Sequence, residues 1–232
     1  MQRKIKIINI TSFCLILISF TAILVLWKFT NLLNNSFQIK HVIIEGYEKS
    51  NISEIENNVT ELKGDLISLN FNSLKEIVES NGWVKRASIK KIFPSTVIIN
   101  ITENDPFAIY FQEGKSFLLD LDGSIITEIN LDNYADDLLF VRGENSPELL
   151  ELLIRDISIA FPNLIKTLDE VEFIEKRRWN LKLDNKILIK LPDENIQQSL
   201  KNLKQLFEEQ EVMQSNIIEI DLRIQGRAAL KV

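Results

Sequence analysis

The sequence contains few of the residues that catalysis and metal binding commonly use. Its 232 residues include one histidine, one cysteine, seven glycines and five prolines. A metal or acid–base site needs several such groups close together, and His41 has neither a second histidine nor a nearby cysteine. With Cys14 as the lone thiol, no intramolecular disulfide can form. We therefore interpret His41 as a structural residue and expect no cofactor and no metal.

The scarcity of glycine also removes two common active-site motifs. No serine lies in a Gly-x-Ser-x-Gly turn, and no glycine-rich loop that could hold a phosphate is present. The adjacent carboxylates Glu208 and Glu209 would point about 100° apart on a helix, so they do not form an acid–base pair. We interpret them, and the pair Asp136 and Asp137, as solvated groups. No enzyme activity and no small-molecule substrate are predicted, with a membrane-anchored hydrolase as one alternative.

Positive charge is also in short supply. The 27 lysines and arginines are outnumbered by 33 aspartates and glutamates, which gives a net charge of −6. Binding to nucleic acid requires clustered lysine and arginine, so no nucleic-acid partner is expected. The one compact basic run in the soluble part, Lys176-Arg177-Arg178 after Glu175, is interpreted as a solvated turn. A patch for an acidic partner segment or a lipid headgroup is the alternative.

The residues around Asp120, Asp122 and Gly123 contain part of a calcium-loop pattern. An EF-hand loop would need an oxygen ligand where Leu118 stands and a glutamate where Ile129 stands. Asp-Gly between two apolar runs is instead a common hairpin turn. We predict a hairpin at this position.

One feature that the sequence does have is a long apolar run. Residues 7–27 carry no charge, and about 20 helical residues cover the roughly 30 Å hydrocarbon core of a bilayer. Trp27 and Phe29 suit the interface at the end of such a span. We predict a cytoplasmic N-terminus at 1–6, a transmembrane helix at 7–27 and a polar linker at 28–36.

The flanking charges predict the orientation of this helix. Arg3, Lys4 and Lys6 precede the apolar run, and Lys28 alone follows it closely, so the positive-inside bias places the N-terminus in the cytoplasm. A cleaved signal peptide is the alternative. Its apolar region is usually 7–15 residues long and ends in small residues, whereas a longer run ending in Trp27-Lys28-Phe29 is found here.

After the linker, residues 37–105 predict a small α+β module with the order β-α-α-β-β. Asn72 or Ser73 is a candidate cap for its second helix. The expected strands are 37–46, 84–90 and 96–103, and the expected helices are 51–60 and 74–80.

Residues 106–232 predict a mixed β domain with flanking helices. Ser146-Pro147-Glu148 is a strong helix start, and Ile196, Leu200, Leu203 and Phe207 form an apolar stripe with helical spacing. Residues 130–137 are predicted to form a loop. The expected strands are 107–111, 117–121, 124–129, 171–176, 179–183, 186–191, 217–223 and 227–232, and the expected helices are 147–160 and 193–212.

Three motifs follow the apolar run in order: Ile43-Ile44-Glu45-Gly46, Gly82-Trp83-Val84 and Lys91-Ile92-Phe93-Pro94-Ser95-Thr96. With these motifs the chain resembles the FtsQ/DivIB family of bacterial cell-division proteins nearly from end to end. The first module resembles a POTRA domain, a polypeptide-binding unit, and the second resembles the family's β domain. Later matching segments are Leu119-Asp120-x-Asp122-Gly123, Arg178-Trp179-x-Leu181, Lys190-Leu191-Pro192 and Asp221-Leu222-Arg223. The residues of the POTRA motif, which the resemblance marks as structural, are Gly46, Trp83, Val84, Phe93, Pro94, Thr96, Glu103 and Pro106.

This resemblance implies a non-enzymatic scaffold of the divisome in the inner membrane, at the division septum, with its folded domains in the periplasm. It implies that the β domain binds the FtsB–FtsL pair, with FtsB added as a strand along the C-terminal edge. The POTRA domain would assist septal recruitment through other division proteins such as FtsK, FtsW or FtsI. The residues implied in partner binding are Arg223, Ile224, Gly226, Ala228, Ala229, Leu230, Lys231 and Val232.

Two alternatives stay open at this stage. The terminal strand could be an ordinary closing strand, because Ile224 and Val232 stand where well-known members carry partner-contacting aromatics. The chain could also be a POTRA-bearing component of polypeptide translocation or outer-membrane assembly. Such proteins usually carry several POTRA units or a C-terminal barrel, and barrel strands of about ten alternating residues are not evident here.

Overall fold

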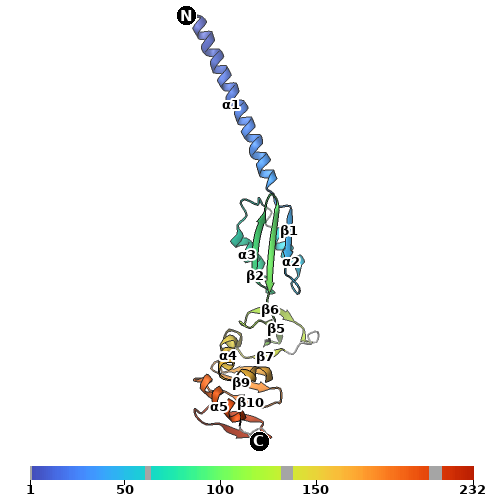
Figure 1. The fold of residues 1–232 in the computed structure, drawn as a ribbon, viewed down its shortest axis with the longest axis vertical. Coiled ribbons are helices and arrows are strands. Elements are labelled where there is room, and N and C mark those ends of the chain that lie inside the picture. The colour runs from blue at the N-terminus through green and yellow to red at the C-terminus, as the bar shows by residue number, and fades with distance from the viewer. Residues whose placement is uncertain (1, 61–63, 132–137, 209–215) are drawn as a thin grey trace. The chain divides into compact units, whose positions relative to one another are not determined.

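The computed structural model describes residues 2–60, 64–131, 138–208 and 216–232 (Figure 1). The chain divides into two compact units, Met1–Glu103 and Asn104–Val232. Each unit has its own hydrophobic core. The predicted α+β class, with an apolar helix followed by a β-α-α-β-β module and a mixed β domain, is confirmed.

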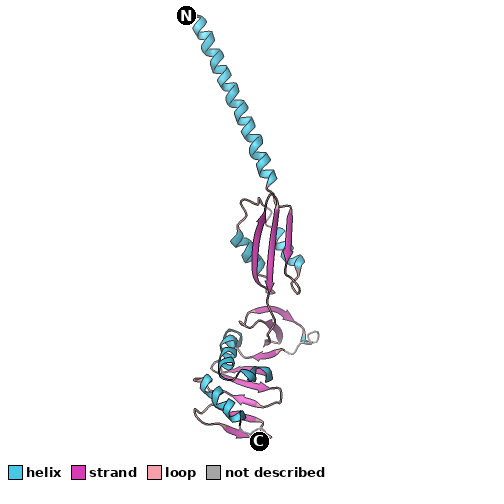
Figure 2. Ribbon diagram, in the orientation of Figure 1, coloured by secondary structure: helices cyan, strands magenta, loops and turns pink. Residues whose placement is uncertain are grey.

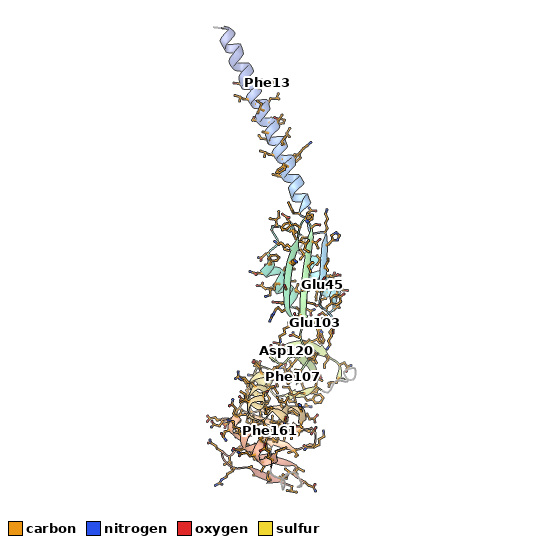
Figure 3. All side chains as sticks on the ribbon, in the orientation of Figure 1. Phe13, Glu45, Glu103, Phe107, Asp120 and Phe161 are labelled. Carbon is orange, nitrogen blue, oxygen red and sulfur yellow. The ribbon has the colours of Figure 1, made fainter. Side chains whose placement is uncertain are left out.

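The first element is the helix α1 (Gln2–Ser36). Its segment Ser12–Thr30 is long and apolar enough to cross a membrane, and the side chains of this segment are exposed, as Figure 3 shows for Phe13. Polar side chains inside it bond to their own helix: Ser19 Oγ donates to the Ile16 carbonyl at 2.8 Å. The helix also includes residues 28–36, where a linker was predicted. No glycine or proline interrupts that stretch, so nothing there ends a helix.

The first unit continues with a three-stranded sheet in the order β1-β3-β2. β1 runs parallel to β3, and β2 runs antiparallel to it. The predicted order β-α-α-β-β is observed (Figure 2). The elements are β1 (His41–Glu45), α2 (Ile52–Thr60), α3 (Phe71–Glu79), β2 (Val84–Ile92) and β3 (Thr96–Glu103).

The start of α3 differs from the prediction. Asn70 is the N-cap, and its side chain accepts hydrogen bonds from the backbone of Asn72 and Ser73, the two residues that were expected to cap the helix. The helix therefore begins one turn earlier, at Phe71. Its Leu74 and Val78, four residues apart, are buried against the sheet together with Ile55 of α2.

The second unit is built on a nine-stranded sheet in the order β12-β11-β10-β9-β8-β7-β4-β5-β6. Its strands are β4 (Ala108–Gln112), β5 (Lys115–Leu119), β6 (Ile125–Ile129), β7 (Leu139–Arg142), β8 (Leu168–Ile174), β9 (Arg178–Leu183), β10 (Leu188–Lys190), β11 (Glu219–Asp221) and β12 (Ala229–Lys231). Its helices are α4 (Ser146–Ala160), the 3-10 helix η2 (Pro162–Thr167) and α5 (Ile196–Glu208).

The core of the second unit lies between the sheet and the helices α4 and α5. Leu150 and Leu153 of α4 and Leu203 of α5 are almost fully buried against strand residues such as Leu181 and Ile220. In β9 every second residue is buried, the pattern of a strand with one covered face. Each large side chain in such a core contributes about 1.5–3 kcal/mol relative to an exposed one.

The turn between β5 and β6 confirms the predicted hairpin. The two strands pair antiparallel, and Asp120, labelled in Figure 3, accepts a hydrogen bond from the Ser124 backbone at 2.8 Å. Gly123 has a φ of +80°, and an added Cβ would lie 2.0 Å from the Pro147 carbonyl oxygen. Asp120 therefore stabilises the turn, and the position of Gly123 accepts only glycine.

The predicted elements differ from the structure at three places. The strand β7 and the helix η2 were not expected, and α5 begins at Ile196 rather than near residue 193. Asn195, directly before α5, has a φ of +56°, which is outside the helical region, so the helix starts only after it. The loop predicted at 130–137 and the end of the helix predicted to reach Val212 lie largely outside the described residues, as do Asp136, Asp137 and Glu209.

Candidate partner-binding edge

The strand β12 lies at one end of the nine-stranded sheet. It pairs antiparallel with β11, with Ala229 opposite Asp221 and Lys231 opposite Glu219. Among the described residues, no strand pairs with its other side. The prediction that the last strand is an edge strand therefore holds for the described chain.

The backbone bonds between β10 and β11 show which groups of β11 point toward β12. Leu188 N–H donates to the Ile218 carbonyl at 3.0 Å, and Leu222 N–H donates to the Lys190 carbonyl at 2.9 Å. The Ile218 carbonyl and the Leu222 N–H therefore point toward β10. Because the direction of backbone groups alternates along a strand, Ile220 also faces β10, while its neighbours Glu219 and Asp221 face β12.

The same alternation fixes the free groups of β12. Lys231 and Ala229 pair with Glu219 and Asp221 and direct their N–H and C=O groups inward. The Lys231 carbonyl accepts a hydrogen bond from the Ile218 N–H at 2.9 Å, which agrees with this direction. Leu230, between them, therefore directs its N–H and C=O away from the sheet. An unpaired donor and acceptor at an edge are the groups that a further strand would satisfy.

Apolar side chains gather around this edge. Ile224 is 67% exposed, Val232 is 74% exposed and Leu230 is 44% exposed. Ile218, next to β11, is also more than half exposed. Leu230 lies opposite the fully buried Ile220, so its side chain is on the sheet face that the helices cover. Strand addition here would therefore cover apolar surface as well as backbone groups.

A shallow groove of about 330 Å³ runs between α5 and the loop that joins β11 to β12. Loop residues Ile224, Gly226 and Ala228 form one side of it. The other side, and the floor, are formed by Ser199, Asn202, Gln205, Leu206 and Leu222.

Two ion pairs within the chain lie beside the edge. Arg223 Nη2 donates to Asp221 at 2.6 Å, and Lys190 Nζ donates to Glu219 at 2.8 Å. The hydrogen bond from Arg223 is the main cause that lowers the pKa of Asp221, although partial burial opposes it. Arg223 is therefore held against its own strand.

In the part of the chain that the structure describes, no three His, Cys, Asp or Glu side chains are grouped so that they could hold a metal ion. His41, at the start of β1, is exposed and lies opposite Thr96 in the register of the sheet.

Comparison with known proteins decides the family. Residues 108–223 match the family "Cell division protein FtsQ/DivIB, C-terminal", and residues 37–104 match "POTRA domain, FtsQ-type". This chain belongs to the FtsQ/DivIB family. The cell division protein FtsQ of Rickettsia bellii is 30% identical over 188 residues, which cover 81% of this chain and 69% of that protein.

More distant FtsQ proteins give the same assignment. The FtsQ of Agrobacterium fabrum is 27% identical over 84% of this chain and 62% of its own length. The FtsQ of Rhizobium radiobacter is 29% identical over 72% of this chain and 79% of its own length. A solved extracytoplasmic domain of DivIB from Geobacillus stearothermophilus is similar at a TM-score of 0.33 and 9% identity over 45% of this chain, and the assignment does not depend on it.

Within this FtsQ-type β domain, the residues predicted to bind a partner lie on the edge strand or line the groove, except for Arg223. Ala229, Leu230 and Lys231 form the edge strand itself, and Val232 follows it. Ile224, Gly226 and Ala228 line the groove, while Arg223 is engaged with Asp221.

The helix residues on the opposite wall of the groove were missed by sequence reasoning. Ser199, Asn202 and Leu206 follow the spacing i, i+3, i+7, which places them on one face of α5. That spacing is present in the sequence. It does not reveal that the loop after β11 lies opposite this face.

Several residues of the FtsQ-type POTRA motif have structural roles in the first unit. Gly46 has a φ of +83°, and a Cβ there would lie 2.3 Å from the Ile101 carbonyl oxygen. Val84 is buried, and Lys49 lies over the ring of Trp83 at 5.7 Å. Thr96 begins β3, and the Phe93-Pro94 bond before it is cis. Pro106 is partly buried in the second unit.

Glu103 has the most hydrogen bonds of this motif. Its carboxylate accepts bonds from the backbone N–H groups of Lys49, at 2.9 Å, and Ser50, at 2.7 Å, and from the Ser50 hydroxyl. Burial raises the pKa of Glu103, but these hydrogen bonds together lower it more, so the net shift is downward. The end of β3 is thereby tied to the segment that leads into α2.

Proposed function

We propose that this chain is a non-enzymatic scaffold of the divisome that binds an FtsB-like partner by strand addition at β12. Family membership supports the role in cell division, and the β domain is the part that would bind the FtsB–FtsL pair. The observation that carries the proposal is the outward-facing N–H and C=O of Leu230 on the edge strand. In this role the chain would link early and late division proteins and help control septal peptidoglycan synthesis.

The proposed location is the inner membrane at the division septum. The helix α1 is long and apolar enough to be a single membrane span, which supports a bitopic protein. With Arg3, Lys4 and Lys6 on the cytoplasmic side, the POTRA and β domains would lie in the periplasm. The proposed boundaries are a transmembrane helix at 7–27, a POTRA domain at 37–105 and a β domain at 106–232.

The POTRA domain would act in recruitment. β1 and β2 are the two outer strands of its sheet, so this sheet also has edges that could receive a peptide. The proposed partners of the POTRA domain are other division proteins such as FtsK, FtsW or FtsI.

The decisive variant for strand addition is Leu230→Pro. Proline has no N–H, so it removes the outward-facing donor without removing a bond between β12 and β11. We expect the full-length protein in nanodiscs to bind the soluble FtsB fragment of the same organism at least about tenfold more weakly, the effect of losing about 1.4 kcal/mol. Biolayer interferometry would measure the affinity.

Leu230→Ala is the matched control because it keeps the N–H and shortens only the side chain. We expect it to weaken binding less than Leu230→Pro does. Ala229→Pro is a poor test, because the Ala229 N–H points inward and its loss would disturb β12 itself. Unchanged melting temperatures would show that the variants are folded. Equal binding of Leu230→Pro and the unmodified protein would rule out pairing along this edge.

A further inference from the structure

A second exposed apolar cluster lies at one end of the POTRA sheet, at the turn between β2 and β3. Phe93 in this turn is 60% exposed, Ile67 is 58% exposed, Phe71 is 41% exposed and Ile92 is 40% exposed. The ring of Phe37 packs edge-on against Phe93 at 5.9 Å. We refer to Phe37, Ile67, Phe71, Ile92 and Phe93 as the juxtamembrane cluster.

Hydrogen bonds hold the members of this cluster side by side. Leu66 N–H donates to the Phe37 carbonyl at 2.7 Å, and Lys40 N–H donates to the Ser95 carbonyl at 2.8 Å. Lys91 Nζ donates to the Leu69 carbonyl at 3.1 Å and lies 4.5 Å from the centre of the Phe71 ring. Three segments distant in sequence are therefore held side by side at this end of the sheet.

This surface is positively charged although the protein is negatively charged overall. The described segments 37–40, 64–71 and 90–95 carry three lysines, Lys40, Lys90 and Lys91, and a single carboxylate, Asp65. Asp65 accepts a hydrogen bond from the Ile67 backbone at 3.2 Å. Exposed aromatic and aliphatic groups next to cations match an anionic lipid surface, where the apolar groups enter the headgroup region and lysines meet phosphates.

The chain itself keeps this surface close to the bilayer. The helix α1 ends at Ser36, and Phe37 of the cluster is the next residue. The 19 residues of Ser12–Thr30 span about 28 Å, close to the thickness of the hydrocarbon core. Residues 31–36 add about 9 Å beyond that segment, or residues 28–36 about 14 Å beyond the span proposed at 7–27, whereas the headgroup layer is about 5–8 Å thick on each side. With α1 inserted, Phe37 therefore lies within about 10 Å of the outer boundary of the headgroups.

We propose that the juxtamembrane cluster docks on anionic lipid headgroups, so that the POTRA domain rests on the membrane surface. This inference depends on the proposed insertion of α1, and on nothing in the proposal for β12. Phe93 and Ile92 contact the headgroup region, while Lys40 and Lys90 provide attraction to anionic lipid. The opposite end of β3, at Glu103, is about 23 Å away by strand length and remains in water.

The test uses the full chain in vesicles and a fluorophore attached to single cysteines. In a Cys14→Ser background, Phe93→Cys reports on the cluster, and Glu48→Cys reports on an exposed position near Glu103. Quenching by headgroup-labelled lipid is measured in phosphatidylglycerol–phosphatidylcholine vesicles. We expect quenching several-fold stronger at position 93 than at position 48, and a clear loss of it at 93 after Lys40→Glu with Lys90→Glu. Melting temperatures confirm folding.

Labelling of the native Cys14 distinguishes a failure of membrane insertion of α1 from a failure of docking. A fluorophore there, quenched by acyl-chain-labelled lipid, shows that α1 is inserted whatever happens at position 93. With α1 inserted, equal quenching at 93 and 48, or quenching at 93 that ignores the lysine reversals, would overturn docking. Protection of position 93 that follows the protein-to-lipid ratio would identify a second copy of the chain as the occupant, and would also overturn it. Absence of quenching at Cys14 would overturn the membrane anchor, and docking with it.

Discussion

At the scale of single residues, two glycines share a left-handed backbone conformation but differ in their surroundings. Gly46 lies in the left-handed region directly after β1, against the Ile101 carbonyl oxygen. Gly226 has a similar φ of +73°, but nothing lies within 4 Å of the position of its missing Cβ. The two glycines therefore separate the cost of backbone conformation from the cost of a clash.

We expect Gly46→Ala to lower the free energy of unfolding by about 2–4 kcal/mol, since it combines a left-handed alanine with a contact of 2.3 Å to backbone. Gly226→Ala, which adds only the conformational cost, should lose about 1–2 kcal/mol. Urea denaturation followed by circular dichroism measures both. Equal losses of unfolding free energy would show that the backbone around Ile101 moves away from the added Cβ at no energetic cost.

At the scale of elements, Glu103 connects the end of β3 to the start of α2. Because its pKa is lowered in the folded state, its contribution is complete at pH values above the pKa of an unfolded glutamate. It is lost as the pH falls through the lowered pKa. The sign follows because protonation removes the charge that the N–H groups of Lys49 and Ser50 stabilise.

Glu103→Gln should therefore cost about 1 kcal/mol at neutral pH, a value kept small because the carboxylate is only partly buried. The gap between the variant and the unmodified protein should close as the pH falls below about 4. Melting temperatures over a pH series would measure this gap, with Glu48→Gln, at an exposed position nearby, as the control. A gap independent of pH would mean that side-chain shape, rather than charge, holds the connection.

Elements with strong local signals were predicted from sequence, and elements that depend on distant pairing were not. The helix Ser146–Ala160 was predicted to within one residue because Pro147 marks its start, and the strand-like run 96–103 was predicted with the bounds that β3 has. The strand β7 has four residues and is defined by its parallel neighbours β4 and β8, which its own sequence cannot reveal.

In the candidate site, too, some features were predicted from the sequence and others were not. The edge strand was predicted from the last apolar run, but its length was overestimated: residues 227–232 were expected and Ala229–Lys231 are observed. The neighbouring strands β10 and β11 are also three residues long, so pairing stops with them. The contribution of α5 to the groove depends on its packing against residues that lie 16 or more positions further along the chain, and no local pattern encodes it.

At the scale of the whole molecule, the two units have separate cores. The core of the first unit includes Leu74, and the core of the second includes Leu203; both side chains are almost completely buried. No residue belongs to both clusters. Stability is therefore local to each unit.

This separation predicts two unfolding transitions in calorimetry of the detergent-solubilised protein. Leu203→Ala should destabilise the second unit by about 2–5 kcal/mol and leave the other transition in place. Leu74→Ala is the matched change in the first unit and should shift the other transition by a similar amount. A single transition that moves with either substitution would contradict independent units.

The three-residue pairing between β11 and β12 has a consequence for motion. A strand attached on one side, through so short a ladder, opens at a small fraction of the free energy needed to unfold the domain. Amide protons of Ala229 and Lys231 would therefore exchange with solvent faster than those in the middle of the sheet. A bound strand on the outer side would place β12 inside the sheet and slow that exchange, so partner binding and the ordering of this segment would be one event.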